Sequence, residues 1–135
     1  MTSPHRLVNP DSLAPPTGFT HAVVAAPGRS VYLAGQTAQA ADGSIQGTTI
    51  CRQFEAATVN VVDALAAAGA RPEHLVSLQI LVTDVEEYRA SLAELGEIYR
   101  RHLGRHYPAV VLFEVSRLFD PAAKVELVAQ AVVPE

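Results

Sequence analysis

The chain has 135 residues, of which 49% are hydrophobic and 18% charged, and its formal net charge is −4. A chain of this length forms one ordinary domain, and this apolar share is enough for a hydrophobic core, which excludes global disorder. The acidic balance argues against nucleic acid, because nucleic-acid-binding proteins favour strongly basic surfaces. We therefore expect a single domain over residues 1–135 with no nucleic-acid partner.

The lone cysteine and the N-terminal segment indicate where such a protein works. Cys51 has no partner for an internal disulfide, so nothing points to an oxidising compartment. We interpret it as a small buried hydrophobe, with a nucleophile as the alternative. Residues 1–18 lack the apolar core of a signal peptide, and no run approaches the ~18–20 apolar residues of a membrane span. These features predict a cytoplasmic protein with no membrane partner.

The N-terminal part predicts an irregular segment followed by a hairpin. Residues 10–18 hold three prolines and a glycine and should be irregular. The apolar runs HAVVAA (21–26) and SVYLAG (30–35) are typical of short strands. Because Pro27 and Gly28 lie between them, we expect the two strands to pair through a turn.

The middle of the chain predicts two helices with a strand between them. Apolar residues recur at helical spacing after Thr49, which can cap the first helix, and Gly69 can end it. Residues 75–83 alternate between apolar and polar side chains, as a half-buried strand does. Asp84 can cap a second helix and Gly104 can end it.

Two further strands, over residues 109–115 and 124–133, complete the order β-β-α-β-α-β. Right-handed crossovers place both helices on the same side of the sheet. The sequence therefore predicts an α+β fold, in which two helices cover one face of a mixed sheet.

Alternation along the strands predicts which side chains face the helices. We expect the helix-facing set to be Val76, Leu78, Ile80, Val82, Ala109, Val111, Phe113, Val115, Val125, Leu127, Ala129, Ala131 and Val133. The opposite face then carries Ser77, Gln79, Leu81, Val110, Leu112, Glu114, Lys124, Glu126, Val128, Gln130 and Val132. The aliphatic residues of that face predict packing against another subunit. Scattered surface aliphatics are the alternative.

Three segments carry a family resemblance. They are SVYLAGQTA (30–38), NVVDALAAAGARPEHLVSLQILVTDVEEY (60–88) and GRHYPAVVLFEVSRL (104–118). Together they resemble the Rid family, also called YjgF, YER057c or UK114, and the similarity extends from Phe19 to Val133.

The resemblance implies a chorismate-mutase-like protomer in a homotrimer, whose sheets form a central barrel with three small-molecule clefts between subunits. Members of the main branch hydrolyse enamines and imines such as 2-aminoacrylate, with no metal and no organic cofactor. An arginine of the family binds the substrate carboxylate, which a planar guanidinium does well. A glutamate on the last strand positions or activates water. Some members have been described as ribonucleases.

The sequence departs from the family at the polar positions of that cleft. The arginine aligns with Val110, and the last-strand glutamate aligns with Val128. The family's tyrosine, serine and asparagine align with Phe19, Ala34 and Gly96. Because a valine cannot bind a carboxylate, we expect weak or absent 2-aminoacrylate (2-iminopropanoate) deaminase activity.

Two polar residues remain as catalytic candidates. Glu114 should lie on the same face as Val110, and a surface or interface ion pair with Arg117 or Lys124 is the alternative. His21 lies close to the family's tyrosine position and is the best acid–base candidate, with a structural hydrogen bond as the alternative. We expect the substrate to contact Phe19, Ala34, Gly35, Gln36, Gly96, Val110, Leu112 and Val128.

The basic cluster RRHLGRHY (100–107) contains two histidines four residues apart, His102 and His106. A metal site is disfavoured, because Gly104 ends the helix between them and no carboxylate follows at ligand spacing. An anion or RNA could bind here, but cations at a helix C-terminus explain the cluster more simply. We expect no metal.

Three functions agree with these features. The first is a trimer that hydrolyses an imine, enamine or related reactive metabolite lacking a carboxylate at the usual place. The second is a trimer that binds or regulates without catalysis. The third is a ribonuclease, which the acidic charge and the missing polar groups argue against.

Overall fold

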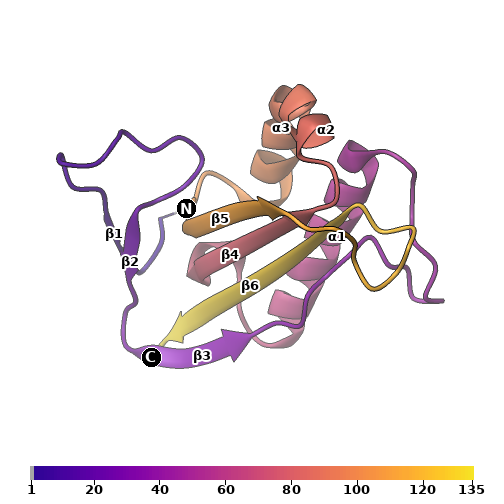
Figure 1. Ribbon diagram of the computed structural model, residues 1–135. Coiled ribbons are helices and arrows are strands. Elements are labelled where there is room, and N and C mark those ends of the chain that lie inside the picture. Colours follow the sequence, from indigo (N-terminus) through magenta and orange to yellow (C-terminus); the bar gives the residue numbers. More distant parts are fainter. Residues whose placement is uncertain (1) are drawn as a thin grey trace.

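A four-stranded mixed sheet is the centre of the computed structural model, which describes residues 2–135 (Figure 1). Its strands are β3 (Gly28–Tyr32), β4 (Leu75–Val82), β5 (Ala109–Glu114) and β6 (Val125–Pro134). They lie in the order β3-β6-β4-β5, and only β4 and β5 run parallel. The parallel strands β4 and β5 are joined by the helical crossover that the sequence predicts. Strand β5 lies at the edge of the sheet.

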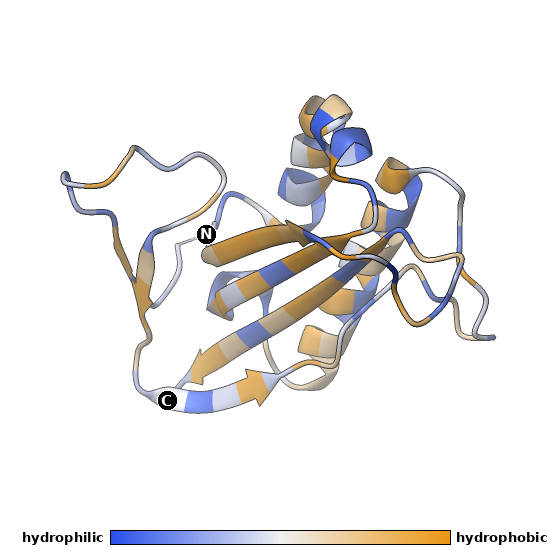
Figure 2. Cartoon of the chain, in the orientation of Figure 1, coloured by the Kyte–Doolittle hydropathy of each residue, from blue (hydrophilic) through white to orange (hydrophobic). Residues whose placement is uncertain are grey.

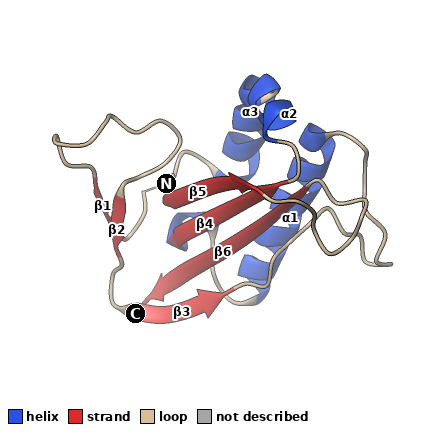
Figure 3. Ribbon diagram, viewed as in Figure 1, coloured by secondary structure: helices blue, strands red, loops and turns tan. Residues whose placement is uncertain are grey.

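Helices cover one face of this sheet, as expected (Figure 3). They are α1 (Ile50–Ala67), α2 (Val85–Ala90) and α3 (Leu92–Leu103), with a short 3₁₀ turn η1 (Pro72–His74) before β4. The Thr49 hydroxyl caps α1 by accepting from the Arg52 amide at 3.2 Å, and the Asp84 carboxylate caps α2. The single helix predicted after Asp84 is wrong, because the chain leaves helical geometry at Ser91 and starts again. Serine is a poor residue for a helix interior, since its hydroxyl competes for backbone hydrogen bonds.

The core lies between the helices and the central strands. Alternation predicted β6 correctly, because Val125, Leu127, Ala129 and Ala131 are all buried toward the helices. The prediction for β4 fails at one position. A β-bulge at Val76 leaves that residue half-buried, and Leu75 enters the core instead.

The prediction for β5 has the two faces exchanged. Val110 pairs with Leu78 and Leu112 with Ile80, so Val110 and Leu112 face the helices. Val111 and Phe113 lie on the open face, where 49% and 40% of their surface is exposed. Figure 2 shows β5 as hydrophobic along its length, so apolar alternation could not choose between its faces. A choice that is off by one residue moves every side chain to the other face.

The exchange also separates residues that the sequence grouped together. Glu114 pairs with Val82 and shares the helix side with Val110, whereas Glu126 and Val128 lie on the open face. The open face is formed by Ser30, Tyr32, Ser77, Gln79, Leu81, Val111, Phe113, Glu126, Val128, Gln130 and Val132. It carries exposed aromatic and aliphatic side chains, of which Tyr32 is 74% exposed.

The predicted pairing of residues 21–26 with residues 30–35 is wrong. Strand β2 (Ala22–Val24) pairs with β1 (Arg6–Val8), a three-residue strand with too weak a pattern to be predicted. Strand β3 pairs with β6 instead. Gly28 is therefore a strand residue and not a turn residue, and a Cβ there would collide with the Val133 carbonyl.

The β1–β2 pair lies beside the main sheet (Figure 1). Hydrogen bonds from residues next to these two strands connect it to the rest of the domain. The buried His5 ring forms a 2.9 Å hydrogen bond with the His74 carbonyl oxygen. Thr20 donates from its amide to the Pro108 carbonyl at 3.0 Å and from its hydroxyl to the Tyr107 carbonyl. These bonds hold the preceding residues, Thr17 to Phe19, beside the entry to β5. Within residues 2–135, no helix is long and apolar enough to cross a membrane.

Candidate small-molecule site

A cavity of about 540 Å³ lies between β5, the helices α2 and α3, and the N-terminal segment; we call it the β5–α3 cavity. Small-molecule sites are commonly of this size and of mainly apolar lining. It is lined by Thr17, Gly18, Phe19, Ile80, Tyr88, Leu92, Leu95, Gly96, Tyr99, Arg100, Tyr107, Val110 and Leu112.

The apolar wall of this cavity follows from the register of the edge strand. Val110 and Leu112 point to the helix side, but in the described part of the chain no further strand lies beyond β5 to fill the space next to them. Leu95 on α3 is buried against the same space, whereas Leu92 is 56% exposed at its margin. The cavity is thus an unfilled margin of the hydrophobic core.

Three tyrosine rings, those of Tyr88, Tyr99 and Tyr107, form part of the wall. Tyr99 stacks on Tyr107 with ring centroids 5.1 Å apart, and its hydroxyl donates to the His106 carbonyl at 2.7 Å. Burial raises the pKa of Tyr99 far above its ordinary value and also raises the pKa of Tyr88. Both phenols therefore stay protonated at neutral pH, and they can donate a hydrogen bond but cannot act as a base.

Arg100 is the one formally charged residue among the described residues that line the cavity. It lies one turn after Gly96 on α3, and a Cβ at Gly96 would be 3.1 Å from the Arg100 Nη1 atom. The guanidinium therefore lies over the bare backbone of Gly96. No carboxylate of residues 2–135 is within 4.0 Å of its nitrogen atoms.

The structure brings four of the predicted substrate-contacting residues to this cavity and leaves four elsewhere. Phe19, Gly96, Val110 and Leu112 line it. The others form a second group at β3 and β6, consisting of Ala34, Gly35, Gln36 and Val128. Within residues 2–135, the second group does not line the β5–α3 cavity.

The second group is held by close backbone packing. Gln36 and Leu127 exchange two backbone hydrogen bonds of 2.8 Å. Gly35 packs against the Glu126 side chain so closely that a Cβ at Gly35 would collide with the carboxylate. A larger residue at position 35 would displace the Glu126 side chain, and the two backbone hydrogen bonds of Gln36 hold the segment beside β6.

Neither candidate catalytic residue lines the β5–α3 cavity. The His21 ring forms a 2.7 Å hydrogen bond with the Ala14 carbonyl and contacts Phe19 edge-on, with centroids 5.1 Å apart. It lies one side chain behind the wall. Glu114 is exposed and accepts a 3.0 Å hydrogen bond from the Val85 amide at the start of α2. It is not within ion-pair distance of Arg117 or Lys124, the partners considered from the sequence.

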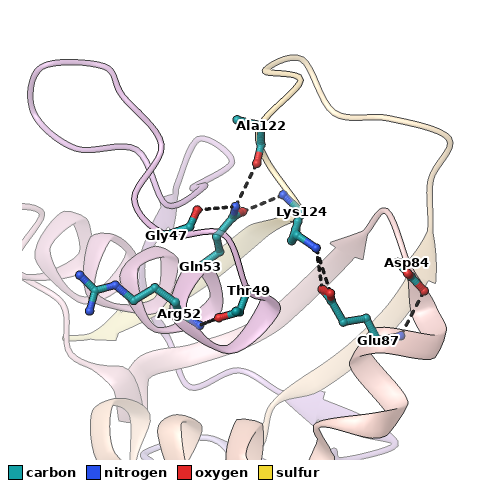
Figure 4. Close-up of polar contacts among 8 residues, drawn as sticks. All are labelled: Gly47, Thr49, Arg52, Gln53, Asp84, Glu87, Ala122 and Lys124. Atoms are coloured by element: carbon teal, nitrogen blue, oxygen red, sulfur yellow. Dashed lines mark hydrogen bonds and ion pairs between the residues drawn. The ribbon is translucent and has the colours of Figure 1, made fainter.

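A second cavity of about 620 Å³ lies between α1 and α3; we call it the α1–α3 cavity. It is lined by Thr49, Ile50, Cys51, Arg52, Glu55, Glu87, Ser91, Glu94, Glu97, Ile98 and Arg101. One Glu55 oxygen accepts from Arg101 at 2.5 Å and forms a 2.8 Å bond with His102. Glu87 pairs with Lys124 at 2.9 Å (Figure 4). Several of its charges are therefore occupied within the protein.

The remaining sequence candidates have structural partners. His102 pairs with Glu55, while His106 is buried and bonds the Leu75 carbonyl at 2.8 Å, so the two rings do not converge. Among residues 2–135, no group of three or more His, Cys, Asp or Glu is arranged for a metal ion. Burial raises the pKa of the half-buried Cys51, and the Glu94 side chain adds to the rise. Cys51 is therefore a neutral thiol and not an activated nucleophile.

Sequence reasoning missed most of the cavity lining for an identifiable reason. The stripe Tyr88, Leu92, Leu95 and Tyr99 predicts a core-facing helix surface, and only the edge position of β5 leaves it partly unfilled. The basic cluster predicts for Arg100 only the role of a cation at a helix C-terminus. Its spacing of four from Gly96, on the apolar stripe's side of α3, was the signal for a role in the cavity.

Comparison with known proteins identifies the class of protein. The family model described as Endoribonuclease L-PSP matches residues 10–133. The chain therefore belongs to this family, which includes the Rid or YjgF/YER057c/UK114 proteins. None of the curated proteins matches the sequence.

Solved structures agree with that membership and with the predicted chorismate-mutase-like fold. YyfB from Yersinia pestis, a Rid protein of unknown function, is 31% identical; the match has a TM-score of 0.85 and covers 96% of this chain and 98% of that one. Rv2704 from Mycobacterium tuberculosis, a YjgF/YER057c/UK114 member, is 34% identical, with a TM-score of 0.63 and coverage of 86% and 87%. The Escherichia coli YjgF gene product is 24% identical, with a TM-score of 0.68 and coverage of 78% and 81%, and shows the shared fold.

Proposed function

We propose that this chain is a Rid-type homotrimer that hydrolyses an imine or enamine bearing an apolar or aromatic group. The observation that carries the proposal is the β5–α3 cavity, because it contains Phe19, Gly96 and Val110, three positions that align with polar residues of the family's cleft. Its wall suits an apolar substrate and offers no cation at Val110. We expect turnover of 2-aminoacrylate to be weak or absent.

The reaction needs only water as co-substrate. The water oxygen adds to the carbon of the C=N bond, and a proton goes to nitrogen, giving a carbinolamine. Loss of ammonia from that intermediate leaves the ketone or aldehyde. An enamine first takes a proton on carbon and then follows the same route. The protonated Tyr88 phenol can donate a hydrogen bond to the developing oxygen or nitrogen, whereas the Tyr99 hydroxyl already donates to the His106 carbonyl.

In the proposed trimer, the β5–α3 cavity of one subunit lies near the Ala34–Gln36 segment and Val128 of another. The open face exposes Tyr32, Val111 and Phe113, and an apolar patch of this kind suits a subunit interface. Packing through that face would let Gly35 and Val128 of a neighbouring subunit approach the β5–α3 cavity. In this proposal, His21 and Glu114 supply acid–base chemistry through an intervening water, because neither side chain lines the cavity.

A second candidate, a binding or regulatory trimer without catalysis, is favoured by a specific observation. His21 bonds the Ala14 carbonyl, Glu114 bonds the Val85 amide, and neither lines the cavity. A ribonuclease is a third possibility, in keeping with the family's description, and the net charge of −4 argues against it.

Release of ammonia from a panel of imines separates these candidates. Imines generated in the assay from phenylalanine, leucine and serine, the last giving 2-aminoacrylate, are followed with and without the protein. We expect acceleration with the aromatic or branched imines and little with 2-aminoacrylate, and loss of it in His21→Gln or Glu114→Gln. Fast deamination of 2-aminoacrylate would contradict the proposed preference for apolar substrates. If the protein accelerates hydrolysis of none of the imines, the binding or regulatory function is favoured instead. Degradation of RNA would instead support the ribonuclease.

The oligomeric state is measured separately by sedimentation. We expect a trimer that Val111→Asp dissociates, because a charge on the open face would be buried at the interface. A monomeric wild-type protein contradicts the trimer and the site that it completes.

A further inference from the structure

We propose that Arg100 is the anion anchor of the β5–α3 cavity, and that the cavity takes a small carboxylate with a branched aliphatic or aromatic body. The inference deepens the proposed function, on which it rests for the choice of this cavity as the ligand site. It moves the anchor from the β5 wall, where Val110 replaces the family's arginine, to the opposite wall on α3.

The Arg100 guanidinium has no ion-pair partner among the described residues that line the cavity. Arg100 contributes the single formal charge to the described lining, and no carboxylate lines the cavity with it. Arg89 lies 2.6 Å from Glu86, Arg101 lies 2.5 Å from Glu55, and Lys124 pairs with Glu87. Arg52 and Arg105 also lack an ion pair among residues 2–135, but neither lines this cavity. Arg100 differs from its neighbour Arg101 in that its guanidinium has no such partner among residues 2–135.

Gly96 leaves space for that guanidinium on the surface of α3. Residues four apart on a helix lie above one another, so Gly96 is directly beneath the Arg100 side chain. A Cβ at Gly96 would lie 3.1 Å from Nη1, closer than carbon and nitrogen normally approach. Glycine in a helix interior lowers stability by about 0.5–1 kcal/mol relative to alanine. The residue is thus unfavourable for α3 but leaves space for the cation beside the cavity.

The other walls of the cavity are mainly apolar and complement the charge of Arg100. Val110, Leu112 and Phe19 offer aliphatic and aromatic surface for the body of a ligand. A guanidinium presents paired donors that match the two oxygens of a carboxylate. Because Arg100 is an exposed residue, the acid group would lie at the mouth of the cavity and the apolar body would lie inside.

The test compares an acid with a neutral molecule of nearly the same shape. The probes are 3-phenylpropanoate and 3-phenylpropanamide, and their dissociation constants are measured calorimetrically on the full chain at pH 7 and low salt. We expect the acid to bind about tenfold more tightly than the amide. High salt should reduce this preference, because an exposed cation is screened.

Variants assign the preference to one residue. Arg100→Gln should abolish the acid's advantage and leave amide binding unchanged, and Arg100→Lys should retain part of it. Arg105→Gln is the matched control, because Arg105 is exposed, lies just after α3 and lines neither cavity. It removes the same charge and should change affinity less than twofold.

Three results would overturn the inference. They are equal affinity for acid and amide, equal effects of Arg100→Gln and Arg105→Gln, and no binding of either probe at millimolar concentration. The imine assay is independent of these measurements. Selective acid binding without ammonia release removes the proposed reaction and leaves the anchor in place, whereas ammonia release unaffected by Arg100→Gln removes the anchor and leaves the reaction.

Discussion

The two cavities lie against different faces of α3 and differ in how their charges are satisfied. The α1–α3 cavity contains the Glu55–Arg101 pair and Glu87, whose partner is Lys124. The β5–α3 cavity contains one cation and an apolar wall. The α1–α3 cavity also contains Arg52, Glu94 and Glu97, which have no ion pair among residues 2–135, so it holds charges of both signs. Exposed ion pairs contribute little stability. The two cavities therefore differ less in volume than in lining, since one combines charges of both signs and the other combines a single cation with apolar surface.

The largest effect is expected where the β5–α3 cavity meets the core. Leu95→Ala removes a side chain that is 2% exposed, and we expect the free energy of unfolding to fall by about 2–5 kcal/mol. Leu92→Ala, at a residue of the same wall that is 56% exposed, should cost less than about 1 kcal/mol. Denaturant unfolding measures both. Equal costs would mean that the wall is not continuous with the core.

A charge at Val110, in the apolar wall of the β5–α3 cavity, should lower the free energy of unfolding by an amount that depends on its sign. Val110→Arg places a second cation opposite Arg100 and Val110→Glu places a carboxylate there; each should cost about 1–3 kcal/mol of unfolding free energy. We expect the glutamate variant to be the less destabilised by about 0.5–1 kcal/mol, because it can pair with Arg100. In an Arg100→Gln background this difference should vanish, as a double-mutant cycle would reveal. If the difference persists there, Arg100 does not face Val110.

The ion pair beside the α1–α3 cavity should give a smaller, pH-dependent effect. The hydrogen bond with His102, helped by Arg101, holds the pKa of Glu55 below its ordinary value of 4.5. The folded state therefore binds this proton less readily than the unfolded chain does, so the stabilisation is present above about pH 4.5 and is lost as the pH falls through the folded-state pKa. Glu55→Gln should cost at most ~1 kcal/mol at pH 7 and flatten the acid side of the stability profile.

The control for Glu55→Gln is Glu97→Gln, since Glu97 lines the same cavity without an ion pair among the described residues. Unfolding at several pH values between 3 and 7 checks both variants. Identical acid profiles for the two variants would contradict the assignment of the effect to Glu55.

The smallest effect is expected at the glycine beneath Arg100, and it has the opposite sign. Gly96→Ala should raise the free energy of unfolding by up to about 0.5–1 kcal/mol, because alanine is the better helix former. The new Cβ meets only the end of a flexible side chain, which can move by a few tenths of an ångström. Thermal unfolding measures the gain, and a loss of stability would mean that Arg100 is held more firmly than its exposure implies.

The sequence determined the core positions of β6 and the order of the main helices and strands, apart from β1 and the helix break at Ser91, because those depend on local patterns. The stripe of α1, the alternation of β6 and the caps Thr49 and Asp84 are all where the residues predict them. The family motifs likewise identified Phe19, Gly96 and Val110 as positions of interest before any cavity was visible. Strong periodicity and short-range capping leave little freedom for a different answer.

Only the tertiary structure decided the faces of β5 and the composition of the site. The run from Val110 to Phe113 is apolar on both sides, so its orientation depends on its register with β4. The edge position of β5 then leaves the wall unfilled and allows Arg100, distant from Phe19 in sequence, to share a cavity with it. Pairing between strands and the position of a sheet edge are non-local properties, and no pattern within a single segment encodes them.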